Sequence, residues 1–138
     1  MSVMESAGAD VGARLVHKTF PPISRYTLAL YCGASGDHNP MHVDIDFAKA
    51  AGFPDVFTHG MLVMGYLGQA LTDAVSPERI RSFSTRFAAI TQVGAELTCE
   101  GTVTEIFQEA GERRARIALT TKDEHGEVKL AGEAVVAI

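Results

Sequence analysis

Hydrophobic and polar residues alternate along most of the second half of the chain. In residues 80–90, Phe83, Thr85 and Phe87 alternate with more polar neighbours. A period of two places successive side chains on opposite faces of a strand. Turns with charged residues or glycine separate three further strand-like segments, at residues 96–107, 113–122 and 128–138. With a shorter alternation at residues 13–20, the pattern predicts one early strand and four late ones.

The segment between the first strand and the late strands has a helical pattern. Ser24 is a good N-cap, and apolar residues follow it at helical spacing until Gly33 and Gly36 end the segment. A second, short helix is predicted in residues 44–53, capped by one of its two aspartates, Asp44 or Asp46.

Residues 58–75 form the longest predicted helix, with Thr58 as a candidate cap. Apolar or small residues lie on nearly every side of its helical wheel, which predicts a helix wrapped by protein. Helices separated from a run of strands indicate an α+β fold with an antiparallel sheet. One twisted sheet wrapped around one central helix, the arrangement called a hot dog, satisfies both features.

The composition is that of an ordinary globular chain. Its 138 residues, 46% of them hydrophobic and 21% charged, fit one domain, residues 1–138. The formal net charge of -5 disfavours a nucleic-acid partner. No apolar run approaches the ~18 residues that a membrane span requires, and the first ten residues do not resemble a secretory signal, so we expect a cytoplasmic protein with no membrane partner. Cys32 and Cys99 are expected to be reduced thiols without a catalytic role.

The stretch YCGASGDHNPMHVD, residues 31–44, concentrates polar groups that an apolar core does not need. His38 and His42 would share one face of a helix, but Pro40 makes this segment a turn or extended chain. The stretch also lacks paired cysteines or an H-E-x-x-H motif, so we expect no metal. A serine hydrolase is disfavoured as well, because no G-x-S-x-G motif is present.

Acid–base chemistry is the remaining interpretation of this stretch. A turn at Asn39-Pro40 lets Asp37 and His42 converge on one water molecule, which a carboxylate and an imidazolium together can add to a substrate. The alternative is an Asx-turn made by Asp37 and Asn39, with His42 exposed.

A second signal is FTHGML, at the start of the long helix. A helix N-terminus presents unpaired amides and partial positive charge, and Gly60 has no side chain to block a ligand oxygen there. The amide of Gly60 could therefore stabilise a thioester carbonyl that becomes an enolate. His59 is as readily a structural hydrogen-bonding residue as a catalyst.

Together these segments resemble the MaoC-like dehydratases, the hot-dog family of (R)-specific enoyl-CoA hydratases and 3-hydroxyacyl-ACP dehydratases. The hydratase motif of that family is matched here by Tyr31, Gly36, Asp37, Asn39, Pro40, His42 and Ala48. Residues 11–37 also resemble the opening of the family, and residues 59–71 resemble its central helix.

The resemblance implies reversible syn addition of water to a trans-2-enoyl thioester, giving the (R)-3-hydroxyacyl product without a metal or redox cofactor. Asp37, His42 and Gly60 would be catalytic, and the substrate would be bound by Asn39, His59 and Met61. The substrate would be an acyl-CoA or acyl-ACP thioester. The resemblance further implies a homodimer, or a heterodimer in which this chain is the catalytic partner.

Two rival functions remain open at this stage. A hot-dog thioesterase would use a carboxylate on or beside the long helix, where the chain offers only Asp73, at the far end. A noncatalytic acyl-CoA-binding module would not need both Asp37 and His42. The sequence also leaves open the acyl chain length and the choice between CoA and acyl carrier protein.

Overall fold

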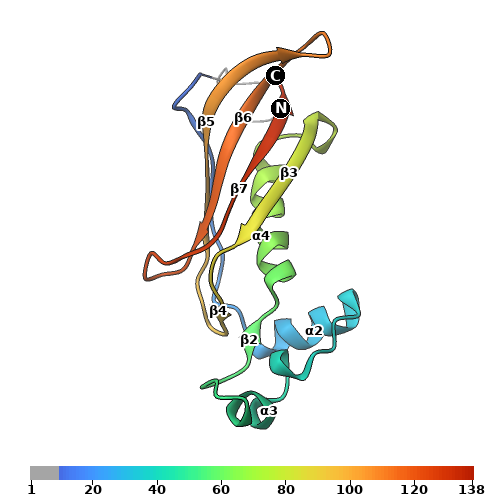
Figure 1. Cartoon of the computed structure of the whole chain (residues 1–138), viewed down its shortest axis with the longest axis vertical. Helices are drawn as coiled ribbons and strands as arrows, with labels where there is room; N and C mark the ends of the chain where they lie inside the picture. The colour runs from blue at the N-terminus through green and yellow to red at the C-terminus, as the bar shows by residue number, and fades with distance from the viewer. Residues whose placement is uncertain (1–9) are drawn as a thin grey trace.

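A five-stranded antiparallel sheet packs against one long helix in the computed structural model, which describes residues 10–138 (Figure 1). The strand order is β1-β5-β6-β7-β3, so that β1 and β3 form the two edges. The bounds are β1 Arg14–Thr19, β3 Ile80–Phe87, β5 Thr98–Glu109, β6 Glu112–Lys122 and β7 Val128–Ala137. The predicted α+β class and antiparallel sheet are therefore confirmed, as are the early strand and the four late strands.

The inner face of the sheet is made by the apolar half of each alternating pattern. Ile117 and Leu119 on β6, and Ala134 and Val136 on β7, are each at most 1% exposed. Charged side chains occupy the other face of the same strands. Because the register of an antiparallel pair decides which face each residue takes, the alternation in the sequence fixes the side that receives the helix.

Helix α4 (Gly60–Ala74) supplies the other half of the core. Val63, Leu67 and Leu71 recur at helical spacing, and each is at most 1% exposed. The opposite side of α4 is open in the single chain: Met61 is 57% exposed, which differs from the fully wrapped helix expected from the sequence. Apolar composition alone could not reveal this, because small residues such as Gly65 fit either a packed or an open side.

The predicted cap of α4 is wrong. Thr58 lies in the short strand β2 (Phe57–Thr58), which pairs with β4 (Thr91–Gln92), and the N-cap is His59, without a side-chain cap. No sequence pattern indicated this two-residue ladder. Its effect is to join the start of α4 to the loop that follows β3.

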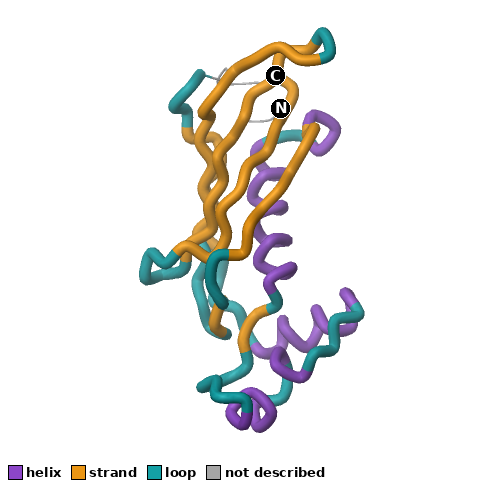
Figure 2. Tube along the Cα trace, in the orientation of Figure 1, coloured by secondary structure: helices purple, strands orange, loops and turns teal. Residues whose placement is uncertain are grey.

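Two short helices lie beyond the lower end of the sheet, beside the N-terminus of α4 (Figure 2). Helix α2 (Arg25–Ser35) begins at the predicted cap Ser24, but it runs through Gly33 and ends at Gly36. Helix α3 (Ile45–Ala50) is capped by Asp44, whose side chain accepts two amides, and not by Asp46. Single-turn 3-10 helices cover Pro40–His42 and Pro77–Arg79.

Both cysteines are free and buried, as expected for reduced thiols. Burial raises the pKa of the Cys99 thiol. In the described part of the chain, no helix is long and apolar enough to cross a membrane.

Ion pairs that share partners join side chains on β3, β5, β6 and β7. Arg81 on β3 pairs with Glu112 at 2.8 Å, and Arg114 also binds Glu112, at 2.9 Å. Arg116 joins Glu105 and Glu133 across three strands. A single exposed ion pair contributes little to the stability of the fold, but pairs that share partners act as a network.

Gly132 on β7 is expected to tolerate no side chain. A Cβ atom there would lie 2.0 Å from the backbone oxygen of Ser84, so the β3–β7 pairing would have to shift. We expect Gly132→Ala to lower the free energy of unfolding by more than ~2 kcal/mol in urea denaturation. In the control, Gly65→Ala on α4, a Cβ meets nothing within 4 Å; this change should stabilise by ~0.5–1 kcal/mol. Equal effects of the two changes would contradict the β7 packing described.

Glu112 is expected to contribute stability that depends on pH. Its hydrogen bonds from Arg81 and Arg114 lower its pKa from 4.5 to about 2. The folded state binds the proton of Glu112 less tightly than the unfolded chain does. The contribution of Glu112 to stability is therefore present above pH 4.5 and is lost as the pH falls toward 2. The difference in Tm between the wild type and Glu112→Gln should therefore narrow over this range. It should also shrink at 1 M salt, since these charges are partly exposed. A difference that is constant with pH would contradict this assignment.

Candidate active site

The polar turn that contains Asp37 is built by its own side chains. Gly36 ends α2 in the left-handed region, with φ of 77°, and so turns the chain. The carboxylate of Asp37 then accepts the amide of Asn39 at 3.2 Å, and the Asn39 side chain accepts the amide of Met41 at 3.1 Å. The Asx-turn weighed from the sequence is thus present. It orients Asp37 and Asn39 but leaves the second carboxylate oxygen of Asp37 without a described protein partner.

His42 lies at the end of this turn and is buried, with 8% of its surface exposed. The exposed His42 of the alternative interpretation is therefore not observed. Its Nδ1 lies 2.6 Å from the backbone oxygen of Phe57, which can only accept a hydrogen bond. Nδ1 must therefore carry the proton, which leaves Nε2 of the neutral ring as a base.

His59 packs directly on His42. The two rings are stacked, with centroids 3.8 Å apart and planes 25° from parallel. Nε2 of His59 donates to the backbone oxygen of Asp37 at 3.3 Å, and the Cys32 sulfur lies 3.5 Å from the same nitrogen. His59 is only 1% exposed, so it lies behind His42 and offers almost no surface to a substrate.

The surroundings of His59 keep its ring neutral. Burial lowers its pKa, and the nearby charge of His42 lowers it further. The hydrogen bond to the Asp37 backbone and the Asp37 charge oppose this without reversing it.

One side-chain atom each of Asp37, His42 and His59 lies within 4.8 Å of the other two. The proximity of two histidines and an acid raises the possibility of a metal site. However, imidazole lone pairs lie in the ring plane, and stacking makes those of His42 and His59 run side by side without converging on one ion. The arrangement fits proton transfer better than metal coordination.

The N-terminus of α4 adjoins this cluster. The carbonyl of His59 accepts the amides of Leu62 and Val63. Within the described residues 10–138, the amides of Gly60 and Met61 have no hydrogen-bond acceptor. Gly60 is exposed and lines an open cavity of about 330 Å³. Unpaired amides at a helix N-terminus can donate hydrogen bonds to a carbonyl oxygen.

Met61 is placed differently from the other residues expected to bind substrate. Its side chain is 57% exposed on the open side of α4, next to Gly60. Asn39 is also exposed, but its side-chain oxygen is used within the turn. The structure thus brings together Asp37, His42, His59 and the amide of Gly60, with Met61 and Asn39 at the margin.

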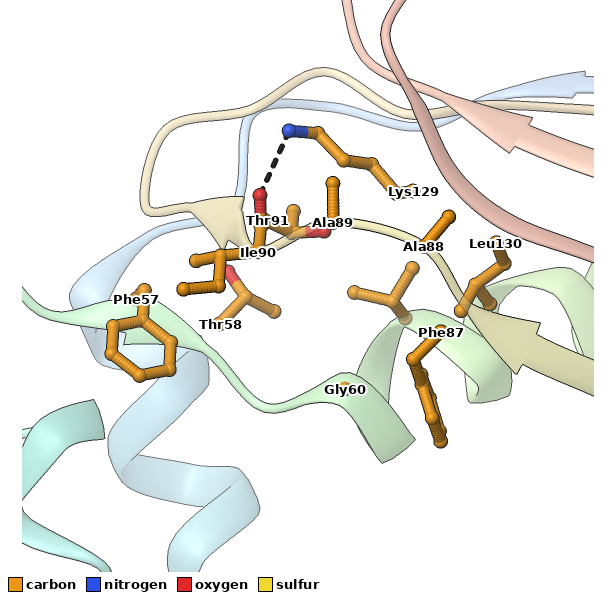
Figure 3. A pocket seen from close by; sticks show the side chains of 11 residues that line it. Phe57, Thr58, Gly60, Phe87, Ala88, Ala89, Ile90, Thr91, Lys129 and Leu130 are labelled. Atoms are coloured by element: carbon orange, nitrogen blue, oxygen red, sulfur yellow. Dashed lines mark hydrogen bonds between the residues drawn. The ribbon is translucent and has the colours of Figure 1, made fainter.

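Sequence reasoning missed several residues that shape the site. The backbone of Phe57 orients His42, and Phe87 lies beside Gly60, where a ring carbon of Phe87 would be 3.1 Å from an added Cβ (Figure 3). Lys129 supports the loop between β3 and β4, where its ammonium donates to the Ile90 carbonyl at 2.8 Å. The sequence did not indicate the burial of Lys129, because a lysine between two apolar residues of a strand is ordinarily exposed.

Comparison with known proteins identifies relatives of this chain. Residues 6–128 match the model of the MaoC like domain family. The chain is 33% identical over 118 residues to an (R)-specific enoyl-CoA hydratase of Rhodospirillum rubrum, an alignment that covers 84% of this chain and 80% of that protein. It is 37% identical over 75 residues to the peroxisomal enoyl-CoA hydratase 2 of Arabidopsis thaliana, covering 52% of this chain and 24% of that longer protein. This chain therefore matches about a quarter of the length of the Arabidopsis relative.

A solved structure shows the same architecture. The unliganded R-hydratase PhaJ1 of Pseudomonas aeruginosa has a TM-score of 0.83 and 28% identity, covering 95% of this chain and 83% of that one. These similarities confirm the family resemblance and the hot-dog fold expected from the sequence. Because the family match covers most of the chain and the solved structure has the same sheet and central helix, this chain belongs to the MaoC-like domain family.

Proposed function

We propose that the protein is an (R)-specific enoyl-CoA hydratase that adds water reversibly to 2-enoyl thioesters. The observation that carries this proposal is the convergence of the Asp37 carboxylate and His42 within 4.8 Å, next to the unpaired amide of Gly60. The hydratase names of the relatives support the reaction type. CoA thioesters are the first substrates to test, with acyl carrier protein thioesters as the alternative.

The geometry suggests a role for each group. The thioester carbonyl would accept the amide of Gly60, which stabilises the enolate that forms at the transition state. Asp37 would take a proton from a water molecule while the oxygen of that water attacks C3 of the substrate. The imidazolium of His42 would give a proton from Nε2 to C2. Water is thereby added across the double bond, and transfer of the proton from Asp37 to His42 through the next water molecule restores both groups.

The thioesterase alternative finds no support in the position of Asp73. This residue lies near the end of α4, ~20 Å from Gly60 at ~1.5 Å per residue. Its carboxylate forms an ion pair with Lys18 on β1. Asp73 is thus remote from His42 and His59 and from the N-terminus of α4.

The expected homodimer stays a prediction. Strands β1 and β3 are edges of the described sheet, and the open side of α4 is uncovered in the single chain. A partner could cover either feature. We propose a homodimer as the simplest assembly, with the heterodimer as the alternative.

Replacement of either catalytic side chain should abolish hydration. With crotonyl-CoA as substrate, we expect Asp37→Asn and His42→Ala each to lower kcat by ~100- to 10,000-fold, because each removes one proton-transfer group. The measurement is the loss of absorbance of the conjugated double bond. Unchanged thermal unfolding would show that the fold survives. Near-normal turnover by either variant would refute the assignment of Asp37 and His42 as the catalytic pair. Release of free thiol by the wild type would indicate a thioesterase.

We also propose that His59 acts by positioning His42 and Asp37, not by contact with substrate. His59→Gln keeps a hydrogen-bond donor in reach of the Asp37 carbonyl but removes the stacked ring. We expect a fall in kcat with little change in KM, and a shifted pH profile, because His42 loses its neutral neighbour. His59→Ala should be more impaired than His59→Gln. A fall in affinity with unchanged kcat would instead support substrate binding by His59.

A further inference from the structure

The cavity of about 330 Å³ beside Gly60 is bounded by the start of α4, the end of β3 and the loop that leads to β4 (Figure 3). Phe57 on β2 belongs both to this cavity and to the surroundings of His42, whose ring centroid lies 5.1 Å from that of Phe57. A thioester carbonyl held by the Gly60 amide would therefore stand at the entrance of the cavity, within reach of the dyad. The part of the substrate that enters the cavity is determined by the chemistry of its walls.

The walls are apolar where they face the cavity. Val63 and Leu130 come from the core, while Phe87 and Ile90 are 53% and 44% exposed, unusual for large apolar side chains. The few polar side chains are engaged elsewhere: the Thr58 hydroxyl donates to the backbone of Gln92 at 3.4 Å. Such walls fit a hydrocarbon chain and not the amide-rich pantetheine arm.

Lys129 fixes the upper wall in place. Its ammonium donates to the Ile90 carbonyl at 2.8 Å (Figure 3). The Lys129 side chain is 4% exposed and also forms ion pairs with Asp123 and Glu127. The backbone amide of Ala88 in turn donates to the Lys129 carbonyl at 2.9 Å. The loop is thus held at both ends, and the cavity is preformed. A ligand does not have to open it.

The volume limits the chain length. A cavity of ~150 Å³ is enough for the six carbons of benzene, so about 330 Å³ accommodates roughly twice that much hydrocarbon, and less of a flexible chain; the rest of a longer chain would remain in solvent. We propose that this cavity receives the acyl chain of short- and medium-chain 2-enoyl thioesters, of about four to eight carbons, and that the ring of Phe87, which takes up space beside Gly60 at the entrance, reduces the volume left for longer chains. This inference rests on the proposed hydratase function.

Phe87 is suited to this role by its position. Its ring covers the Cα of Gly60 so closely that an added Cβ would lie 3.1 Å away. It stands at the last position of an edge strand, where its loss leaves the sheet pairing and the helix intact. Phe87→Ala should therefore enlarge the cavity without unfolding the protein.

The test measures kcat/KM of the purified protein for trans-2-enoyl-CoA substrates of four to twelve carbons. For the wild type we expect kcat/KM to rise by up to about fourfold per added methylene to about eight carbons, and then to fall at least about tenfold by twelve. In Phe87→Ala, the ratio of twelve-carbon to four-carbon kcat/KM should increase at least about fivefold. Val63→Met, which fills the same cavity, should shift the preference toward four carbons.

The matched control is Phe107→Ala, which removes a phenylalanine on the outer face of the sheet, where its ring contacts Arg116. This change should leave the chain-length profile unchanged. A Phe87→Ala profile parallel to the wild type, or a wild type that accepts twelve carbons as readily as four, would overturn the inference while leaving the hydratase function standing.

Binding of saturated acyl-CoA, measured by calorimetry, separates the two proposals. These ligands have no double bond to hydrate, so their affinities report on the cavity alone. If no enoyl-CoA is hydrated, the proposed function fails, yet a chain-length preference of binding that changes in Phe87→Ala would still support the cavity assignment. Affinities that are independent of chain length in both proteins would overturn it.

Discussion

The hydrogen bond from His42 to the Phe57 carbonyl connects the two halves of the site. The acid and the imidazole come from a turn that lies beyond the sheet, whereas the unpaired amides belong to the central helix. This hydrogen bond, the stack of His42 on His59 and the hydrogen bond from His59 to the Asp37 backbone together bring the turn against the residues that precede α4. Since His59 also holds the Asp37 backbone, one short segment before the helix orients both groups of the dyad.

Two of the polar residues in the proposed site also build the turn. Asp37 and Asn39 close the turn with their side chains, which satisfies backbone amides that would otherwise need water. A turn built in this way is rigid and leaves room for one more partner on the Asp37 carboxylate. The Asx-turn and the proposed catalytic role are therefore compatible, and the burial of His42 contradicts only the exposed side chain of the alternative interpretation.

Much of the fold could be predicted from the sequence, because the strand alternation and the caps at Ser24 and Asp44 are local signals. The positions of Asp37 and His42 followed from Pro40 and the motif around it. The role of Phe57 could not be foreseen, since it depends on a backbone carbonyl and not on a side chain. The contact of Phe87 with Gly60 could not be foreseen either, because it depends on how the end of β3 lies against α4. Long-range packing of this kind has no periodic signature in a single sequence.

The narrow clearance between Gly60 and Phe87 links two positions that are 27 residues apart in the chain. An alanine at position 60 would press its methyl group against the aromatic ring, and a smaller residue at position 87 would relieve that pressure. Substitutions at the two positions are therefore not independent. Any attempt to reshape this entrance has to alter them as a pair, or else accept a shifted Phe87 ring at the point where we propose that the substrate carbonyl is held.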